Sequence, residues 1–287
     1  MAPPKKSPER TLTRLLGIAE RGQWAEAKAK TVLARNAEIC IEFLGAAKLA
    51  SEVTRTDLRE LCEFLSEAGN SGSTINRKLS SLSVLMKIAE DEEWIDRAPK
   101  FPRRKEAAHR VRFFDNDEED AMIFQCSAGG FHALADFIEF GIDTGFRKME
   151  ILGLELKDCK GGRAVLHAGA TKSDQGRSVP LTQRAQEIVA KRLEKGHTTL
   201  FQDLTYTQLR YQWDCLRDSL GKKEDDGFII HTLRHTCASR FAIQGQNASF
   251  VAQWMGHSSI MVTQRYMHLG AGLVGGAEIL DGYRKRN

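Results

Sequence analysis

Residues 231–266 read HTLRHTCASRFAIQGQNASFVAQWMGHSSIMVTQRY, and this stretch decides how the rest of the chain is interpreted. Its reactive side chains are His231, Arg234, His235, His257 and Tyr266. No carboxylate occurs between Asp226 and Glu278. Arginine, histidine and backbone N–H groups bind phosphate, whereas a nearby carboxylate would repel it. An anionic, phosphate-bearing substrate is therefore the first hypothesis.

Composition predicts a soluble protein that is not secreted. The chain has 287 residues, enough for one or two domains, of which 41% are hydrophobic and 28% charged. No apolar run approaches the roughly 18 residues of a membrane span, and MAPPKKSPER leads into no signal-peptide core. The six cysteines form no CxxC pair, which favours reduced thiols and argues against a zinc site or other metal. A cytoplasmic, nucleoid-associated protein is expected.

The net charge of +4 is too small to drive nucleic-acid binding, so any affinity would have to come from local patches. The clearest patch lies within an expected linker, residues 97–114. It contains Arg97, Lys100, Arg103, Arg104, Lys105, Arg110 and Arg112 against the single acid Glu106. A solvated linker is the plain alternative, but this run also holds two prolines and separates two differently built halves.

The first half is expected to be a small helical, DNA-binding domain over residues 11–96, after a disordered start at 1–10. Apolar residues recur at three- and four-residue steps over 12–19, 33–44, 58–65 and 79–89, which predicts four or five helices. Thr54 and Asp57 are spaced as a helix cap. Arg77 and Lys78, at the first turn of a helix, are candidate DNA contacts. Simple capping by Ser73 or Thr74 is the competing interpretation of that stretch.

The second half, residues 115–269, is expected to mix helices with a small antiparallel sheet. Asp115 and Glu118 are spaced as an N-cap pair, and a buried helix follows over 134–142. A turn at 144–145 leads into a short helix. Strands are expected at 154–157, 164–166 and 178–180, then helices over 185–193 and 207–220. The fold class is therefore α+β, mainly α.

Each polar group of this half has a plain structural alternative. Arg147 and Glu150 are spaced as a surface ion pair, and Lys172 as a solvated turn residue. A single histidine is more often a buried imidazole or a cap, and Tyr266 could be packing. Their order favours one site instead: Arg-x-x-Glu, a lysine between strands, His-x-x-Arg-His, Gly-His, then a tyrosine nine residues on.

These segments closely resemble the catalytic domain of the tyrosine recombinases, the phage-integrase family. The matching segments are TGFRKMEILGLEL (144–156), TKSDQGRSVPL (171–181), HTLRHT (231–236), WMGHSS (254–259) and RYMH (265–268). The resemblance covers roughly Asp115 to Leu269, with all six expected catalytic positions filled. The helical first half resembles the family's core-binding domain.

The resemblance implies that Tyr266 attacks a DNA phosphodiester, forms a 3′-phosphotyrosyl link and releases a 5′-hydroxyl. A phenol with a pKa of about 10 needs help to lose its proton, and His231 is the expected helper. Lys172 would protonate the leaving oxygen. His235 is expected to be structural.

The same resemblance assigns the charge-stabilising groups. Arg147 and Arg234 would hold the non-bridging phosphate oxygens, and His257 would donate a hydrogen bond to the same phosphate. Glu150 would orient Arg147 or a neighbouring histidine. Because the covalent link stores the bond energy, no nucleotide, metal or other cofactor is expected.

The implied partners are double-stranded DNA attachment sites and three further copies of the chain in a homotetramer. The two halves would clamp the duplex, with Arg103, Arg104 and Lys105 of the linker crossing its backbone. The tail at 270–287 would contact a neighbouring protomer. The resemblance leaves room for an accessory directionality or DNA-bending protein. No membrane is involved.

The leading interpretation is an integrase that inserts and excises a phage or other mobile element at simple core sites. A chromosome-dimer resolvase with the same chemistry is an alternative, and so is a non-catalytic DNA-binding regulator that kept the fold. A type IB topoisomerase fits less well, because the chain is smaller and its first half is helical.

Overall fold

A computed structural model describes residues 10–106, 111–169 and 176–270. The chain divides into two units, Met1–His109 and Arg110–Asn287, and each is described by itself. Among the described residues, no helix combines the length and apolar character needed to cross a bilayer.

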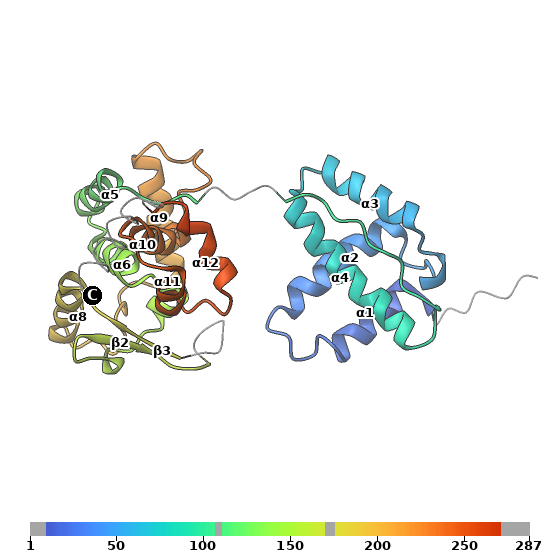
Figure 1. The fold of residues 1–287 in the computed structure, drawn as a ribbon, viewed down its shortest axis with the longest axis horizontal. Coiled ribbons are helices and arrows are strands. Elements are labelled where there is room, and N and C mark those ends of the chain that lie inside the picture. The colour runs from blue at the N-terminus through green and yellow to red at the C-terminus, as the bar shows by residue number, and fades with distance from the viewer. Residues whose placement is uncertain (1–9, 107–110, 170–175, 271–287) are drawn as a thin grey trace, which may run out of the picture. The chain divides into compact units, whose positions relative to one another are not determined.

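The first unit is helical, as its periodicity predicts (Figure 1). Its elements are α1 (Leu12–Arg21), α2 (Lys30–Leu44), the 3-10 helix η2 (Ala50–Glu52), α3 (Arg55–Glu67) and α4 (Gly72–Asp91). Their apolar stripes meet in one core, in which Leu12, Leu58, Leu82 and Leu85 are fully buried. Cys40 and Cys62 lie in the same core, so these thiols pack as small apolar residues.

Capping side chains fix the helix starts of this unit. The Thr54 hydroxyl accepts from the Asp57 N–H of α3, and the Asp57 carboxylate accepts from the Thr54 N–H, which confirms the expected capping pair. The cap of α4 is Ser71, so the expectation of Ser73 or Thr74 is wrong by two or three residues.

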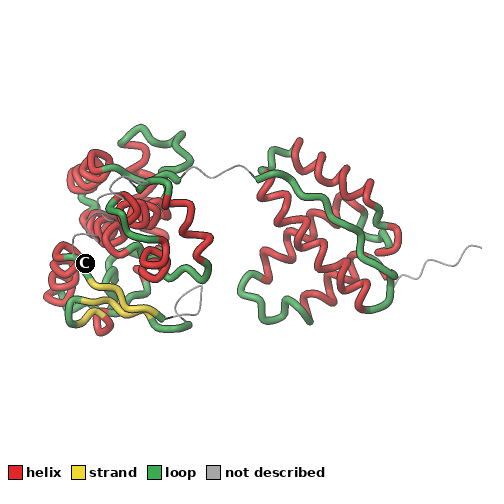
Figure 2. Tube along the Cα trace, viewed as in Figure 1, coloured by secondary structure: helices red, strands yellow, loops and turns green. Residues whose placement is uncertain are grey.

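The second unit carries eight α-helices in its described residues, with a small sheet on one side (Figures 1 and 2). The helices are α5 (Asn116–Ala128), α6 (His132–Thr144), α7 (Lys148–Leu152), α8 (Gln183–Glu194), α9 (Tyr206–Ser219), α10 (His231–Ile243), α11 (Ala248–Met255) and α12 (Ile260–Met267). Asp115 caps α5 through the Glu118 N–H, as predicted. Helix α6 packs against α10 at the centre, with Phe137, Phe140 and Ile138 fully buried.

The sheet orders its strands β1-β2-β3, all antiparallel: β1 (Cys159–Lys160), β2 (Arg163–Leu166) and β3 (Arg177–Pro180). The expected strand at 154–157 is wrong, because residues 156–158 form the 3-10 helix η3 (Leu156–Asp158). Gly161 and Gly162 both have positive φ, so a two-residue turn pairs Lys160 with Arg163. The strand before β2 must therefore end at Lys160. The mainly α, α+β fold class is confirmed.

Candidate functional site

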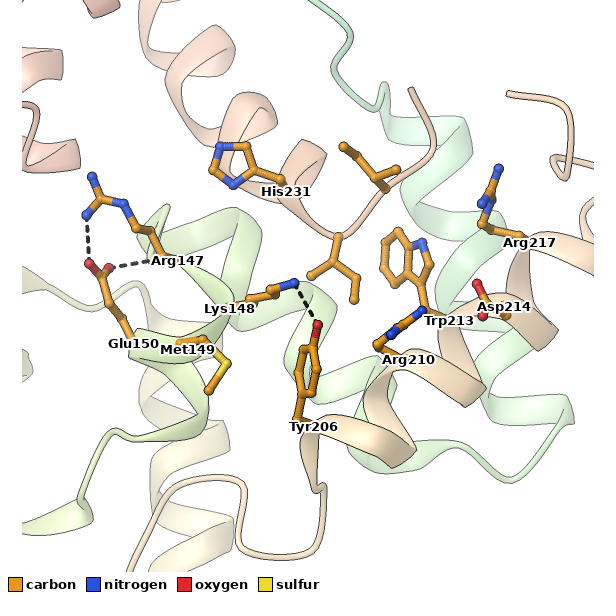
Figure 3. Close-up of a pocket in the computed structure, with 12 residues that line it drawn as sticks. Arg147, Lys148, Met149, Glu150, Tyr206, Arg210, Trp213, Asp214, Arg217 and His231 are labelled. Atoms are coloured by element: carbon orange, nitrogen blue, oxygen red, sulfur yellow. Dashed lines mark hydrogen bonds and ion pairs between the residues drawn. The ribbon is translucent and has the colours of Figure 1, made fainter. Parts of the chain in front are cut away.

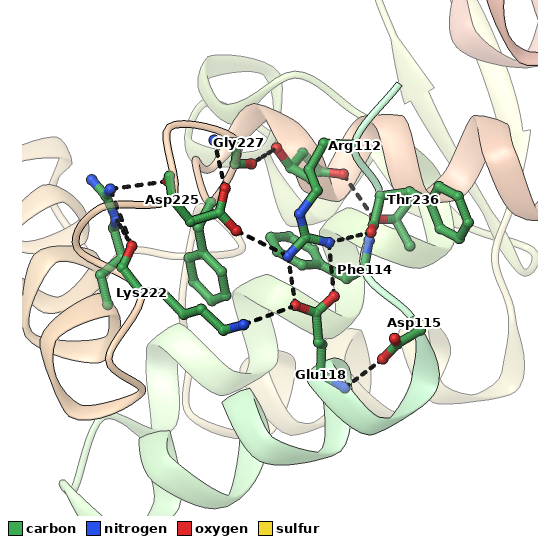
Figure 4. A network of polar contacts seen from close by, with 12 residues as sticks. Arg112, Phe114, Asp115, Glu118, Lys222, Asp225, Gly227 and Thr236 are labelled. Carbon is green, nitrogen blue, oxygen red and sulfur yellow. Dashed lines mark hydrogen bonds and ion pairs between the residues drawn. The ribbon is translucent and has the colours of Figure 1, made fainter. Parts of the chain in front are cut away.

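An ion-pair network holds the start of α10 (Figure 4). Arg112 donates to Glu118 on α5 at 2.7 Å and reaches Asp225 in the loop before α10 at 3.3 Å. Within that loop the Asp225 carboxylate accepts from the Gly227 N–H at 2.8 Å, and the Gly227 carbonyl accepts from Thr232 at 2.6 Å. These contacts fix the end of α10 that carries His231 and Arg234.

Arg234 joins two turns that bear other candidate site residues. Its guanidinium donates to the Gly145 carbonyl at 2.6 Å and to the Met255 carbonyl. Gly145 precedes Arg147 by two residues, and Met255 precedes His257 by two. Gly145 has a φ of 66°, and a Cβ there would stand 2.7 Å from the Met255 sulfur, so only glycine fits this close approach.

The guanidiniums of Arg234, Arg147 and Arg177 lie near one another, and we call these three residues the arginine group. Arg234 is 3% exposed, and burial followed by the charges of Arg147 and Arg177 lowers its pKa to about 9. It still carries its charge at neutral pH. The result is a buried concentration of positive charge, which suits a phosphate group.

Glu150 is the counter-charge of the group. Its carboxylate accepts from the Arg147 N–H at 2.9 Å, from the Arg147 guanidinium at 2.7 Å and from Arg177 on β3 at 2.7 Å. Burial would raise the pKa of Glu150, but the hydrogen bonds and charges of Arg177 and Arg147 outweigh it, and the pKa lies below its usual range. The side chain is only 3% exposed, so Arg147 and Glu150 are more than a surface pair.

His257 follows Gly256, which ends α11 with a φ of 64°. Its Nδ1 lies 2.8 Å from the hydroxyl of Thr263, a fully buried residue of α12. Burial, then the charges of Arg234 and Arg147, lower the pKa of His257 to about 4. The ring is therefore neutral at pH 7. If Thr263 donates to Nδ1, the Nε2–H is left to donate to a ligand.

Tyr266 is buried on α12, with 2% of its surface exposed. Its hydroxyl lies 2.6 Å from Nδ1 of His235. The ring of His235 in turn meets the ring of His231 edge-on, at 4.8 Å between centroids. Burial raises the pKa of the Tyr266 phenol, against the lowering effect of Arg265 and Arg234. The phenol thus lies within the field of the arginine group.

A pocket of about 640 Å³ opens beside these residues (Figure 3). Arg147, Glu150 and His231 line it from one side, and Tyr206 and Arg210 of α9 from the other. It offers space next to the arginine group and the exposed end of α10.

The structure brings together five of the predicted catalytic-site residues through contacts or mutual electrostatic effects: Arg147, Glu150, Arg234, His257 and Tyr266. His231 joins them through His235, and Lys172 lies outside the described residues. Arg177 and Thr263 were not predicted. Both stand in quoted or neighbouring motif segments, but nothing in their spacing signals a contact with Glu150 or His257.

The candidate DNA contacts of the first unit gather at the start of α4. Asn76, which is buried, accepts from the Arg104 N–H and donates to the Arg104 carbonyl, both at 2.9 Å. The basic segment is therefore bound to α4, with Arg103 and Lys105 exposed. On α4 itself Arg77 is exposed, while Lys78 donates to Asn70 at 2.6 Å.

Comparison with known proteins identifies the family of the chain. The model of the phage integrase family matches residues 112–271, more than half of the chain. The integrase of Salmonella phage P22 is 28% identical over 210 residues, which are 67% of this chain and 52% of that protein. The tyrosine recombinase XerC of Thermodesulfovibrio yellowstonii is 27% identical over 252 residues, 79% of this chain and 82% of its own length. The chain thus spans about half the length of the phage relative.

Solved structures share the fold. The Tn1549 transposon integrase, in complex with transposon right end DNA, superposes with a TM-score of 0.76 at 20% identity, covering 89% of this chain and 94% of the other. A lambda integrase dimer bound to a core site gives 0.69 at 15% identity, covering 88% and 97%. The expected resemblance is confirmed: this chain belongs to the phage integrase family.

Proposed function

We propose that this protein is a site-specific tyrosine recombinase, an enzyme that cuts and rejoins DNA strands through a 3′-phosphotyrosyl intermediate. One observation carries the proposal: the charge of buried Arg234 acts on both the buried hydroxyl of Tyr266 and the ring of His257, which is neutral at pH 7. That combination supplies a nucleophile and an anion-binding site in one place.

In the first step the Tyr266 oxygen attacks the phosphorus, and the bond from phosphorus to the 5′ oxygen breaks. The phenol proton passes to a nearby imidazole. The family resemblance implies that His231 is this proton acceptor. Lys172 supplies a proton to the departing 5′ oxygen. A 5′-hydroxyl from a partner strand then reverses the step and rejoins the DNA.

Charge on the pentavalent transition state is met by Arg147, Arg234 and the Nε2–H of His257. Arg234 is fixed by two backbone carbonyls and provides standing positive charge, while Arg147 is held by Glu150 at the edge of the pocket. Such preorganised donors need no rearrangement when charge develops.

Double-stranded DNA attachment sites are the substrate, and a homotetramer on two such sites is the assembly. Relatives with the same fold were solved bound to DNA, one of them as a dimer on a core site. Arg77, Lys78, Arg103, Arg104 and Lys105 supply contacts outside the active site. An accessory directionality or DNA-bending protein fits the scheme, and the enzyme would work on the nucleoid of a bacterial or phage-infected cell.

Two biological roles are compatible with this chemistry. The relatives include a phage integrase and a XerC recombinase, so integration of a mobile element stands beside resolution of chromosome dimers. An integrase recombines two different sites, whereas a resolvase acts on two copies of one site. Plasmids carrying either arrangement of selected sites discriminate between the roles.

A suicide duplex tests the chemistry. The DNA is selected by binding from a randomised pool and nicked beside the cleavage position, so that the released fragment diffuses away. The wild type should give a covalent adduct that survives detergent. Tyr266→Phe should abolish the adduct and leave DNA binding nearly unchanged, because only the nucleophilic oxygen is lost.

Tyr211→Phe is the matched control, since Tyr211 is 66% exposed on α9 and should not affect the yield. An adduct that survives Tyr266→Phe would move the nucleophile elsewhere, with Tyr283 next to test. Binding without any adduct in the wild type would favour a non-catalytic regulator.

A further inference from the structure

The imidazole of His235 contacts the hydroxyl of the proposed nucleophile, Tyr266. Its Nδ1 lies 2.6 Å from the Tyr266 hydroxyl, at the short end of the range for a hydrogen bond. Given the proposed recombinase function, on which this inference rests, we propose that His235 is the catalytic base that takes the proton of Tyr266 during strand cleavage.

The two histidines of α10 differ in placement. His231 and His235 are four residues apart, so they share one face of the helix. His231 is exposed and lines the pocket, while His235 is half-buried and meets buried Tyr266. The His231 ring packs edge-on against the His235 ring, and we assign His231 the role of a positioning residue that supports this base.

The phenol needs a base because its surroundings make it a weaker acid. Its burial outweighs the help of Arg265 and Arg234, and the pKa of Tyr266 is raised. His235 accepts only in the tautomer that carries its hydrogen on Nε2, with the Nδ1 lone pair aimed at the hydroxyl. The short contact is compatible with that tautomer.

The step balances. As the tyrosine oxygen bonds to phosphorus, its proton moves to Nδ1 and His235 becomes an imidazolium. The bonding pair between phosphorus and the 5′ oxygen leaves with that oxygen, which takes a proton from the general acid. In rejoining, the 5′-hydroxyl returns its proton to the general acid as its oxygen bonds to phosphorus. The bond from phosphorus to the tyrosine oxygen breaks, and His235 returns its proton to that oxygen.

The variant His235→Asn tests whether residue 235 only holds the Tyr266 phenol in place or also accepts its proton. The amide oxygen can accept the Tyr266 hydrogen bond near the Nδ1 position but is not a base. Single-turnover adduct formation on the suicide duplex should fall by about 10²- to 10⁴-fold, the usual contribution of general acid–base catalysis. DNA binding and the thermal midpoint should stay close to those of the wild type. His132→Asn, an exposed histidine at the start of α6, is the matched control.

Fluorinated tyrosine at position 266 distinguishes a base from a structural support, because a purely structural role of His235 would not make the cleavage rate depend on the acidity of the phenol. Its phenol is more acidic and depends less on a base. It should therefore raise the rate of the His235→Asn enzyme far more than that of the wild type. Should His235→Asn fail to fold, as loss of DNA binding would reveal, His235→Ala tested with added imidazole replaces it, with restored cleavage expected.

Opposite results overturn the assignment. Cleavage by His235→Asn within about threefold of wild type would leave His235 as a support for the phenol. Equal acceleration of both enzymes by fluorotyrosine, or no effect of imidazole on His235→Ala, would do the same. These failures differ from failure of the recombinase proposal, which would appear as a wild type that forms no adduct at all.

Discussion

His257 illustrates how the arginine group acts on a single residue. It is neutral at pH 7 because burial and the charges of Arg234, Arg147, Arg177 and Arg265 lower its pKa to about 4. A neutral ring can donate to a phosphate without adding another charge to the arginine group. The environment of His257 therefore opposes protonation of the ring and leaves it neutral, so that it can donate a hydrogen bond.

This shift predicts how stability depends on pH. Between the unfolded pKa of 6.5 and the folded value of about 4, the unfolded chain binds a proton that the folded chain does not. Stability must rise with pH across that window and be lost as the pH falls through it. Thermal midpoints measured from pH 7 down to 4.5 should decline more steeply for the wild type than for His257→Asn, which cannot titrate. Parallel curves would contradict the buried, neutral histidine.

Single residues also show how far the sequence could lead. The order of the motifs along the sequence predicts four of the site residues, namely Arg147, Arg234, His257 and Tyr266. The contact of His235 with Tyr266 did not, since it joins residues 31 apart on two helices. Only the packing of α10 against α12 creates it, and no local spacing announces such a contact.

At the scale of elements, Glu150 connects the short helix α7 to strand β3. It binds Arg147 at the start of α7 and Arg177 at the start of β3. The sequence favoured a strand over 154–157, but the glycine turn at 161–162 shifts the sheet along the chain. The register that follows sets Arg177 opposite Leu166. In this register Arg177 stands at the first position of β3 and binds Glu150.

Glu150→Gln tests this connection. Losing the carboxylate charge leaves Arg147, Arg177 and Arg234 close together without their counter-charge. Breaking a buried ion pair in this way should cost about 3 kcal/mol of unfolding free energy, measured by urea denaturation. Glu155→Gln is the matched control. That acid is 43% exposed in its pair with Lys157, so the change should stay below about 0.5 kcal/mol.

Equal losses for the two variants would show that Glu150 behaves as a surface charge. A loss confined to Glu150→Gln would place the cost in the arginine group.

At the scale of the whole molecule, the net charge of +4 hides an uneven distribution. Arg103 and Lys105 stand exposed on a segment whose backbone is bound to Asn76 of α4. This part of the expected linker belongs to the first unit, where its backbone is held at Arg104. A segment whose backbone is already held binds a phosphate backbone at a smaller entropic cost than one that must first be ordered.

Joint replacement of Arg103 and Lys105 by glutamine should weaken DNA binding and flatten its salt dependence. Each lost phosphate contact removes about 0.9 from the slope of log K against log salt concentration, as measured by fluorescence anisotropy. Arg35→Gln is the matched control, because Arg35 is exposed on α2 but already paired with Glu38 and Glu42. An unchanged slope in the double variant would exclude the segment from the DNA interface.

Asn76→Ala separates the placement of these charges from their number. It removes both hydrogen bonds to Arg104 and the one that Asn76 donates to the Glu106 carboxylate, and it keeps every basic side chain. If placement matters, the affinity should fall because the segment must be ordered on binding, while the salt slope stays near the wild-type value, since the same phosphate contacts form in the end. A slope that falls with the affinity would mean that the contacts themselves are lost. Anisotropy titrations at several salt concentrations, run beside the double variant, distinguish the two outcomes.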